Sequence, residues 1–481
     1  MKDITDYLEA TIEDLQEKMN KKEVTARELT LYYLKRIATY DQSLSSVLEI
    51  NPEAVHIAAS LDVERERLGA RSVLHGIPIL LKDNIDTGDK MHTSAGTLVL
   101  GHSYAKKDAF LVQKLRDAGV VILGKTNMSE WAYFMSSEGM PSGYSARGGQ
   151  TNNPYGPGKF DVGGSSSGSG AAIASNLAVA AVGTETSGSI LSPASQNSLV
   201  GIKPTVGLVS RSGIIPLSHT QDTAGPMART VRDAVHLLHV MVGDDKEDVI
   251  TSTCTYPSTK LLEALNDASL VGKRIGVVRN SKIMDALDQD KKVVYEKALK
   301  QLEDAGANVI DHVSIPSSSR EWSYDVLTHE FKANLNAYLA RLDASVANRT
   351  LKEIIKWNRE NKETALAYGQ SLLELSELTS GSLTETDYLN ALYEDDYYSK
   401  RAGIDVVLTD HELDALVFPN NLGAAIPAKA GYPSLTVPAG YTEAGEPVGV
   451  TFTAKAWGEP LLIEIAEAYE QATKARRPPS L

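Results

Sequence analysis

The sequence has a single cysteine, Cys254, among 481 residues. One thiol cannot form an internal disulfide, and it supplies too few ligands for a cysteine-type zinc or iron–sulfur site. Cys254 also lies in a polar loop, residues 251–257, which is a poor setting for a catalytic thiol. Disulfide-stabilised folds and cysteine-dependent metal chemistry are therefore excluded.

Long apolar runs are also missing. No stretch of 18 apolar residues occurs, so the sequence predicts no helix that spans a membrane. The N-terminus carries Asp3, Asp6 and Glu9 and has no apolar core segment, which is not the pattern of a signal peptide. We therefore expect a cytoplasmic protein.

Basic side chains are outnumbered, with 48 Lys and Arg against 62 Asp and Glu, for a net charge of −14. This balance disfavours nucleic acids and acidic membranes as partners and favours solubility. The one basic cluster, residues 474–479, is a short tail that we expect to be solvated. The expected partners are a small amide or peptide-amide substrate and water, and the chain is expected to act as a monomer or homo-oligomer.

Histidines are few, and two of them have a spacing that metal sites use. His236 and His239 lie three residues apart in the expected helix 234–242, but no third ligand is evident. We interpret both as packed residues of that helix. No metal and no cofactor is expected.

What the sequence does contain is two serine-bearing glycine loops, residues 163–170 and 183–190, with Ser189 following Ser165 by 24 positions. A Gly/Ser run is often a linker, but this one leads into residues 171–182, which are too apolar to be solvated. The pattern predicts a helix over 169–176 and a buried strand over 178–182. The first loop then lies at a helix N-terminus, where free N–H groups favour negative charge.

Three functional interpretations of these loops compete. A phosphate-binding P-loop is rejected because neither loop has the required lysine. A nucleophile elbow centred on Ser166 matches the Gly-x-Ser-x-Gly pattern, but no buried strand precedes it and no histidine stands in a distinctive setting for a Ser–His–Asp triad. The third interpretation makes Ser189 the nucleophile, with a base from elsewhere in the chain.

A lysine is the natural candidate for that base. The apolar run Ile77–Leu81 ends directly in Lys82 and has the character of an interior strand. Burial disfavours the ammonium form and lowers a lysine pKa, which turns the amine into a base near neutral pH.

With Lys82, Ser165 and Ser189 together, the chain resembles the amidase signature family of Ser–Ser–Lys hydrolases. The resemblance covers roughly residues 5–480. It rests on an ordered set of motifs at 124–130, 149–155, 163–194, 201–210, 220–226, 430–440 and 464–472. It implies an α/β fold: a single large α/β/α domain, residues 1–481, whose central mixed, twisted sheet is covered by helices on both faces.

The resemblance also implies roles for individual residues. Ser189 corresponds to the nucleophile that is acylated, Ser165 to a bridging serine held by a cis peptide bond, and Lys82 to the general base. Ser166 would support the lysine or cap the following helix. The oxyanion hole would be formed by the backbone N–H groups of Thr186, Ser187, Gly188 and Ser189.

Departures from the family pattern narrow the expected activity. Leu191 stands where the family usually has Arg, Glu185 where Asp is commonest, and Ser187 where Gly is. The second loop and residues 144–150 most resemble bacterial peptide amidases, which release ammonia from C-terminal peptide amides. The alternatives are the catalytic subunit of a glutamine-dependent tRNA amidotransferase, an amidase of simple aliphatic or aryl amides, and a non-enzymatic binding protein on the same scaffold.

Along the chain, the core catalytic region is expected at about 70–230. Two helices are expected between Ile4 and Ala38, and strands at 271–278 and 307–311 should bracket a helix at 293–305. Residues 315–400 have helical periodicity and predict an insertion that shapes the substrate pocket. Its tyrosines either line that pocket or pack in its core, as tyrosines at helical spacing more often do: Tyr388, Tyr393, Tyr397 and Tyr398. Strands return at 413–419 and 448–453.

Overall fold

The computed structural model describes residues 6–481, and an 11-stranded mixed sheet runs through its centre. The strand order is β1-β3-β2-β6-β8-β7-β12-β13-β11-β9-β10. The bounds are β1 (Val47–Ile50), β2 (Pro78–Lys82), β3 (Val121–Thr126), β6 (Ala180–Glu185), β7 (Val200–Lys203), β8 (Thr223–Ala228), β9 (Arg274–Val278), β10 (Asn308–Val313), β11 (Ala415–Pro419), β12 (Ser434–Tyr441) and β13 (Pro447–Thr453). A separate two-stranded sheet pairs β4 (Tyr144–Ser145) with β5 (Gly149–Gln150).

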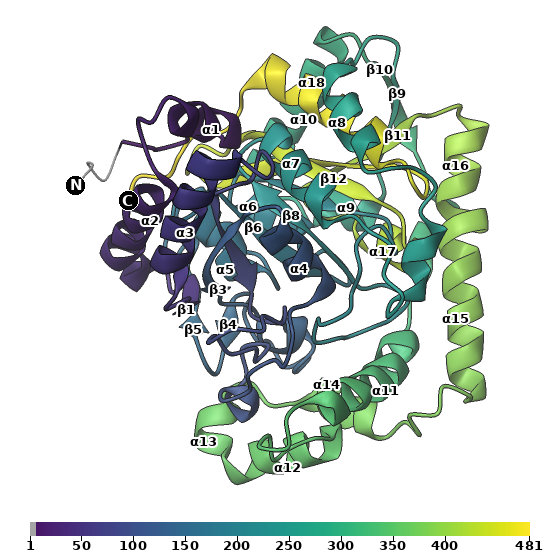
Figure 1. Cartoon of the computed structure of the whole chain (residues 1–481). Helices are drawn as coiled ribbons and strands as arrows, with labels where there is room; N and C mark the ends of the chain where they lie inside the picture. Colours follow the sequence, from purple (N-terminus) through teal and green to yellow (C-terminus); the bar gives the residue numbers. More distant parts are fainter. Residues whose placement is uncertain (1–5) are drawn as a thin grey trace.

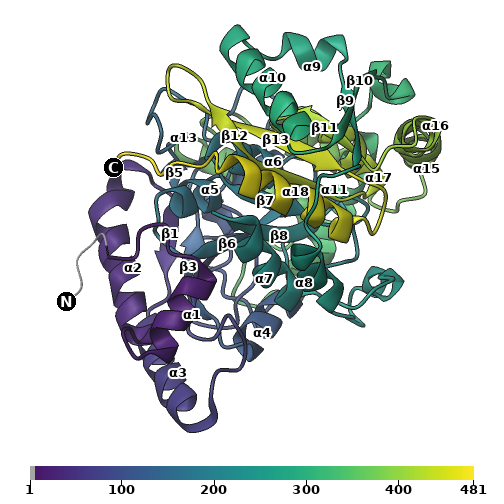
Figure 2. The same ribbon diagram turned by 90° about the horizontal axis from the view of Figure 1, so that it is seen from above.

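Helices cover both faces of the sheet (Figures 1 and 2). They are α1 (Ile12–Asn20), α2 (Ala26–Tyr40), α3 (Ala54–Leu68), α4 (Phe110–Asp117), α5 (Ser167–Ala174), α6 (Leu191–Gln196), α7 (Val231–Met241), α8 (Thr259–Asn266), α9 (Ser281–Asp285), α10 (Gln289–Asp304), α11 (Asp325–Arg341), α12 (Leu351–Glu360), α13 (Lys362–Ala365), α14 (Ser371–Glu377), α15 (Thr386–Ser399), α16 (Asp405–Asp410), α17 (Ala425–Ala430) and α18 (Glu459–Thr473). This α/β architecture is the one expected from the sequence.

The strands that carry the candidate site lie at the middle of the sheet. β2 pairs in parallel with both β3 and β6, and every residue of β2 and β6 is buried. Parallel strands covered on both faces are typically continuous apolar runs, which explains why the two could be recognised in the sequence. The exception is Lys82, the last residue of β2, which is fully buried.

Several expected elements are confirmed with shifted ends. The strands predicted at 77–81 and 178–182 are β2 and β6, and the helix predicted over 169–176 is α5, which begins two residues earlier. The helix predicted at 293–305 is α10; it begins at Gln289 because the Asp288 side chain caps it by accepting the Lys291 N–H. The N-terminal helices are α1 and α2, while Ile4 lies outside the described residues.

Between β10 and β11 the chain leaves the sheet and forms the helices α11 to α16. In Figure 1, α11 to α14 gather below the sheet, and α15 and α16 run along its right-hand edge. Within the part of the chain that the structure describes, no helix has both the length and the apolar character that crossing a bilayer would demand.

Candidate active site

Lys82 is held at the end of β2 by contacts with the neighbouring strand β6. Leu81 pairs with Val182, a register that brings the Lys82 amine beside Thr184. The amine nitrogen, Nζ, lies 2.8 Å from Ser165 Oγ, 2.9 Å from Thr184 Oγ1 and 3.1 Å from the Thr184 carbonyl oxygen. The lysine and the serine predicted from the sequence are thus in hydrogen-bond contact.

Thr184 orients this amine. A neutral amine has two N–H groups and one lone pair. If Thr184 O and Thr184 Oγ1 accept the two N–H groups, the lone pair is left to accept the Ser165 hydroxyl proton. Asn84 Nδ2 donates to Thr184 Oγ1 at 3.0 Å and fixes that hydroxyl in place. The arrangement has the nucleophile–base–orienter logic of a triad, with Thr184 as the group that orients the base.

The environment of Lys82 favours its neutral form. Burial lowers the pKa of Lys82 from 10.5 to about 7, although the negative charges of Glu185 and Asp222 act in the opposite direction. Near neutral pH the amine is therefore divided between the ammonium form, which only donates hydrogen bonds, and the free base. A lysine in this state is suited to general-base chemistry.

The two glycine loops meet at the site. The Gly164–Ser165 peptide bond is cis, and the Ser165 carbonyl accepts the Ser129 N–H at 3.0 Å. The next residue, Ser166, donates its N–H to the Ser189 carbonyl at 3.1 Å, which ties the first loop directly to the second. Ser189 keeps a small exposed fraction of 7%, whereas Lys82 and Ser165 are fully buried.

Ser166 supports the lysine indirectly. Its hydroxyl donates to the Thr184 carbonyl at 3.0 Å and accepts the Thr184 N–H at 3.2 Å, and it makes no capping bond to α5. The close approach requires a glycine in β6, because a Cβ on Gly183 would lie 2.8 Å from Ser166 Oγ. Ser166 therefore fixes the backbone of the residue that orients Lys82.

The Glu185 carboxylate shapes the loop that carries Ser189. Its Oε1 accepts the Gly188 N–H at 2.7 Å, and its Oε2 accepts the N–H groups of Ile190 and Leu191 at 2.7 and 3.1 Å. The Gly188 N–H is thus already engaged. Of the four N–H groups expected to form an oxyanion hole, those of Thr186, Ser187 and Ser189 have no acceptor among residues 6–481.

Changing Glu185 to glutamine should loosen this loop. A glutamine side chain replaces one acceptor oxygen by an NH₂ group, which faces backbone donors instead of accepting from them. We expect kcat/KM to fall about 10- to 100-fold, the equivalent of losing a hydrogen bond to a charged group. The lower limb of the pH profile should also move to lower pH, because Glu185 raises the pKa of Lys82.

The matched control is Asp233→Asn. Asp233 is another buried carboxylate that accepts a backbone N–H, from Ile12 at 2.9 Å, far from the loops. A Glu185→Gln enzyme with the wild-type rate and pH profile would contradict the assigned role.

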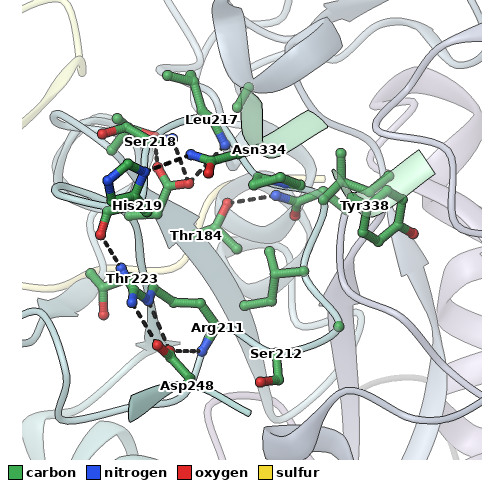
Figure 3. Close-up of a pocket in the computed structure, with 18 of the residues that line it drawn as sticks. Thr184, Arg211, Ser212, Leu217, Ser218, His219, Thr223, Asp248, Asn334 and Tyr338 are labelled. Carbon is green, nitrogen blue, oxygen red and sulfur yellow. Dashed lines mark hydrogen bonds and ion pairs between the residues drawn. The ribbon is translucent and has the colours of Figure 1, made fainter. Parts of the chain in front are cut away.

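A cavity of about 220 Å³ adjoins the cluster (Figure 3). Thr184 and Thr186 contribute to one wall, and the face of α11 that carries Tyr338 contributes to another. Apolar side chains form much of the remaining lining: Ile214, Ile215, Pro216 and Leu217. Arg211 also lines the cavity, but its guanidinium is paired with Asp248 at 2.6 Å.

Two buried carboxylates hold the loop that borders this cavity, residues 217–222. Asp222 accepts the N–H groups of Leu217 and Ser218 at 2.7 and 2.8 Å and the Thr186 hydroxyl at 2.6 Å. Glu330, on α11, accepts the Ser218 hydroxyl at 2.6 Å. The helical excursion is therefore bonded directly to the loops of the site.

None of the four tyrosines considered from the sequence lines this cavity. Tyr388 is buried and donates its hydroxyl to Glu330 at 3.1 Å, so it packs in the helical region. Tyr393 is 70% exposed on α15 and stacks on Tyr397. The guanidinium of Arg320 lies 4.2 Å from the centre of the Tyr398 ring.

The remaining candidates from the sequence lie elsewhere. Cys254 is partly buried and contacts the Tyr256 carbonyl. His236 lies 3.1 Å from Glu13, and His239 lies 3.0 Å from the Ser258 carbonyl. Residues 6–481 contain no group of three or more His, Cys, Asp or Glu side chains arranged to hold a metal ion.

Thr184, Asn84 and Asp222 were not singled out in the sequence. Thr184 and Asn84 lie next to recognised residues, but their contacts depend on how β2 and β6 are aligned, and the two residues are 100 positions apart. The only sequence signal was their place beside Lys82 and Glu185, at the ends of two buried strands.

A buried lysine and two glycine loops at the middle of a mixed sheet define the molecule as an α/β enzyme, and comparisons with known proteins identify the family. A family model described as Amidase matches residues 28–463. The crystal structure of a peptide amidase from Stenotrophomonas maltophilia superposes with a TM-score of 0.93 at 44% identity, covering 99% of each chain.

Two curated relatives extend the comparison. A probable amidase of Arabidopsis thaliana is 41% identical over 485 residues, covering 98% of this chain and 91% of the relative. A glutamyl-tRNA(Gln) amidotransferase subunit of Acinetobacter baumannii is 31% identical over 488 residues, covering 98% and 97%. The chain belongs to the amidase family and is a hydrolase of carbon–nitrogen bonds.

Proposed function

We propose that this enzyme hydrolyses C-terminal amides of peptides, with Ser189 as nucleophile and Lys82 and Ser165 as its proton relay. The observation that carries the proposal is the Lys82 amine: it is fully buried, 2.8 Å from Ser165 Oγ, and Ser165 belongs to the loop bonded to that of Ser189. A buried lysine so placed is suited to accept a proton from a serine.

In the first half-reaction, neutral Lys82 takes the Ser165 proton while Ser165 takes the proton of Ser189. Ser189 Oγ then attacks the amide carbonyl carbon. No hydrogen bond joins the two serine hydroxyls in the free protein described over residues 6–481, so Ser189 Oγ turns toward Ser165 when substrate binds, as catalytic contacts often tighten only then. The N–H groups of Thr186, Ser187 and Ser189 receive the oxyanion, a contribution of about 3–4 kcal/mol per donor.

The second half-reaction completes the proton and bond balance. The relay returns its proton to the leaving nitrogen, the carbon–nitrogen bond breaks, and ammonia leaves an ester between the acyl group and Ser189. Water, deprotonated by the same relay, attacks that ester. The carboxylic acid is released, and Ser189 regains its proton.

The choice of substrate rests on the likeness to the peptide amidase, which extends over the whole chain at 44% identity. The second candidate is the catalytic subunit of a glutamine-dependent amidotransferase, favoured by the 31% identity to the Acinetobacter amidotransferase protein over 98% of this chain. A third is an amidase of simple amides.

Ammonia release by the isolated chain separates these candidates. The substrates are C-terminally amidated dipeptides, simple aliphatic amides and glutamine. Turnover of the dipeptide amides supports the proposal, whereas turnover of simple amides alone contradicts the peptide assignment. Turnover of glutamine alone, or of nothing until the other proteins of an amidotransferase are added, favours the second candidate.

The proposed mechanism predicts that kcat/KM rises with pH with an apparent pKa near 7, the value to which burial lowers the pKa of Lys82. The sign follows from the proton: below this pH Lys82 is an ammonium ion and cannot accept the Ser165 proton. The measurement is kcat/KM for a peptide amide from about pH 5 to 9. A flat profile with chemistry rate-limiting would contradict a neutral-lysine mechanism.

A further inference from the structure

One face of α11 forms a wall of the cavity next to the cluster. Asn334, Ala337, Tyr338 and Arg341 all line the cavity, and their spacing of three and four residues places them on one side of the helix. Tyr338 is the largest uncharged side chain in this wall. In Figure 3 its ring lies on the side of the cavity beyond Thr184.

The Tyr338 ring is tethered at its far end. Its hydroxyl donates to Asp86 Oδ1 at 2.8 Å, although the two residues are 252 positions apart in the chain. Asp86 is fixed in the core by its backbone, because its N–H donates to the Gly213 carbonyl at 2.8 Å and its carbonyl accepts the Ala109 N–H at 3.0 Å. Asp86 also lies only four residues after Lys82.

The tether is a hydrogen bond to a charged group under the conditions of catalysis. Burial raises the pKa of Asp86 to about 6, so the carboxylate is ionised at the pH where Lys82 becomes neutral. Burial and the neighbouring Asp86 raise the pKa of Tyr338 well above its usual value, which keeps the phenol a donor. Bonds of this type are about twice as strong as neutral ones, so the ring is held firmly.

The cavity itself is small. Its volume of about 220 Å³ lies below the roughly 300–1,000 Å³ of common ligand sites. A rigid aromatic wall in a space of this size sets a limit on the group that enters. The apolar lining at 214–217 favours an uncharged group.

We propose that Tyr338 is the specificity-determining residue of the acyl site, a fixed wall that limits the residue bearing the carboxamide to small, uncharged side chains. Asp86 is its positioning residue. This inference rests on the proposed function, because it assigns the cavity to the acyl side of the amide.

The test compares two amides that differ in the size of one side chain, N-acetyl-alanine amide and N-acetyl-tryptophan amide. Wild type should prefer the alanine amide. Tyr338→Ala should raise the tryptophan-to-alanine ratio of kcat/KM about 10- to 100-fold, the range that a few methylene groups command in a pocket. Most of the change should come from a lower KM for the tryptophan amide.

Tyr338→Phe tests the tether separately, since it keeps the ring and removes the hydroxyl that Asp86 holds. We expect a rise of about threefold in the same ratio, because the freed ring can tilt away. A ratio equal to that of wild type would overturn the role of Asp86. Tyr393→Ala is the matched control, since Tyr393 is 70% exposed and outside the cavity.

If folded Tyr338→Ala, verified by its thermal unfolding, leaves the ratio within twofold of wild type, the inference is overturned. Failure of the proposed function gives a different result: wild type then releases no ammonia from either amide. In that case the ratio of Ser189 labelling rates by a methyl and a naphthylmethyl fluorophosphonate decides, with the same expected change in Tyr338→Ala and the same limit for rejection.

Discussion

Ser189→Ala should abolish ammonia release from peptide amides, with kcat falling by at least about 10³-fold. The expected loss is this large because no acyl-enzyme forms without the nucleophile, and the remaining groups, a base and an oxyanion hole, then act only on water. The measurement is ammonia release under saturating substrate, with active enzyme quantified by its thermal unfolding. KM should change little, because the cavity that binds the acyl group does not include Ser189.

Ser192→Ala is the control for this experiment, since Ser192 lies three residues further along the same segment, in α6, and makes no contact with Lys82 or Ser165 among the contacts of residues 6–481. A Ser189→Ala enzyme that keeps a few per cent of the wild-type rate would point to another nucleophile. If Ser166 is that nucleophile in a Ser–His–Asp mechanism, replacing one histidine should be as damaging, and replacing Lys82 should not be.

Lys82→Met is expected to lower kcat by about 10²- to 10⁴-fold, the usual contribution of a general base. Methionine has a similar length but no lone pair to accept the Ser165 proton. The residual rate should lose its dependence on pH near 7, the value near which Lys82 titrates in the wild type and to which burial has lowered its pKa. The measurement is kcat/KM across that range for both enzymes.

The matched control is Lys203→Met. Lys203 is also fully buried, and burial lowers its pKa to about 8, but its amine donates to the Tyr432 carbonyl at 2.7 Å and does not contact Ser165. Lys203→Met should therefore retain the neutral-pH rise in activity. Equal losses in the two variants would indicate that burying any lysine matters for folding, and would contradict a specific role for Lys82.

Lys82 also predicts a cost in stability that its replacement removes. Its pKa is about 7 in the folded protein and about 10.4 in an unfolded chain. Between these values the unfolded state binds a proton that the folded state does not, so this group's contribution makes the free energy of unfolding rise with pH. Lys82→Met should therefore unfold at a higher temperature than wild type near pH 7, and this advantage should shrink toward pH 10.

The sequence predicted the parts of the site that are local. β2 and β6 were recognisable because parallel strands buried on both faces are apolar throughout. The glycine loops were recognisable because they interrupt that pattern with small residues. Lys82 stood out as a charge at the end of a buried strand, and the ordered motifs identified the family.

The contacts that span long distances in the chain could not be predicted. Thr184 meets Lys82 only because β2 and β6 are paired in one register, and a shift of one residue would turn its side chain to the opposite face of the sheet. The bond between Tyr338 and Asp86 depends on how α11 packs against the sheet. Helical periodicity shows that a helix has an apolar face but not which partner receives it.

The excursion between β10 and β11 separates two kinds of information in the chain. Residues 82–189 contain the lysine and both serines, whereas α11, which walls the cavity, belongs to a stretch that leaves the sheet at one strand and rejoins it at another. Mutation or recombination within that stretch can remodel the recognised molecule while the bond-breaking apparatus is inherited unchanged. New amide preferences can therefore arise here in lineages that never pass through an inactive ancestor.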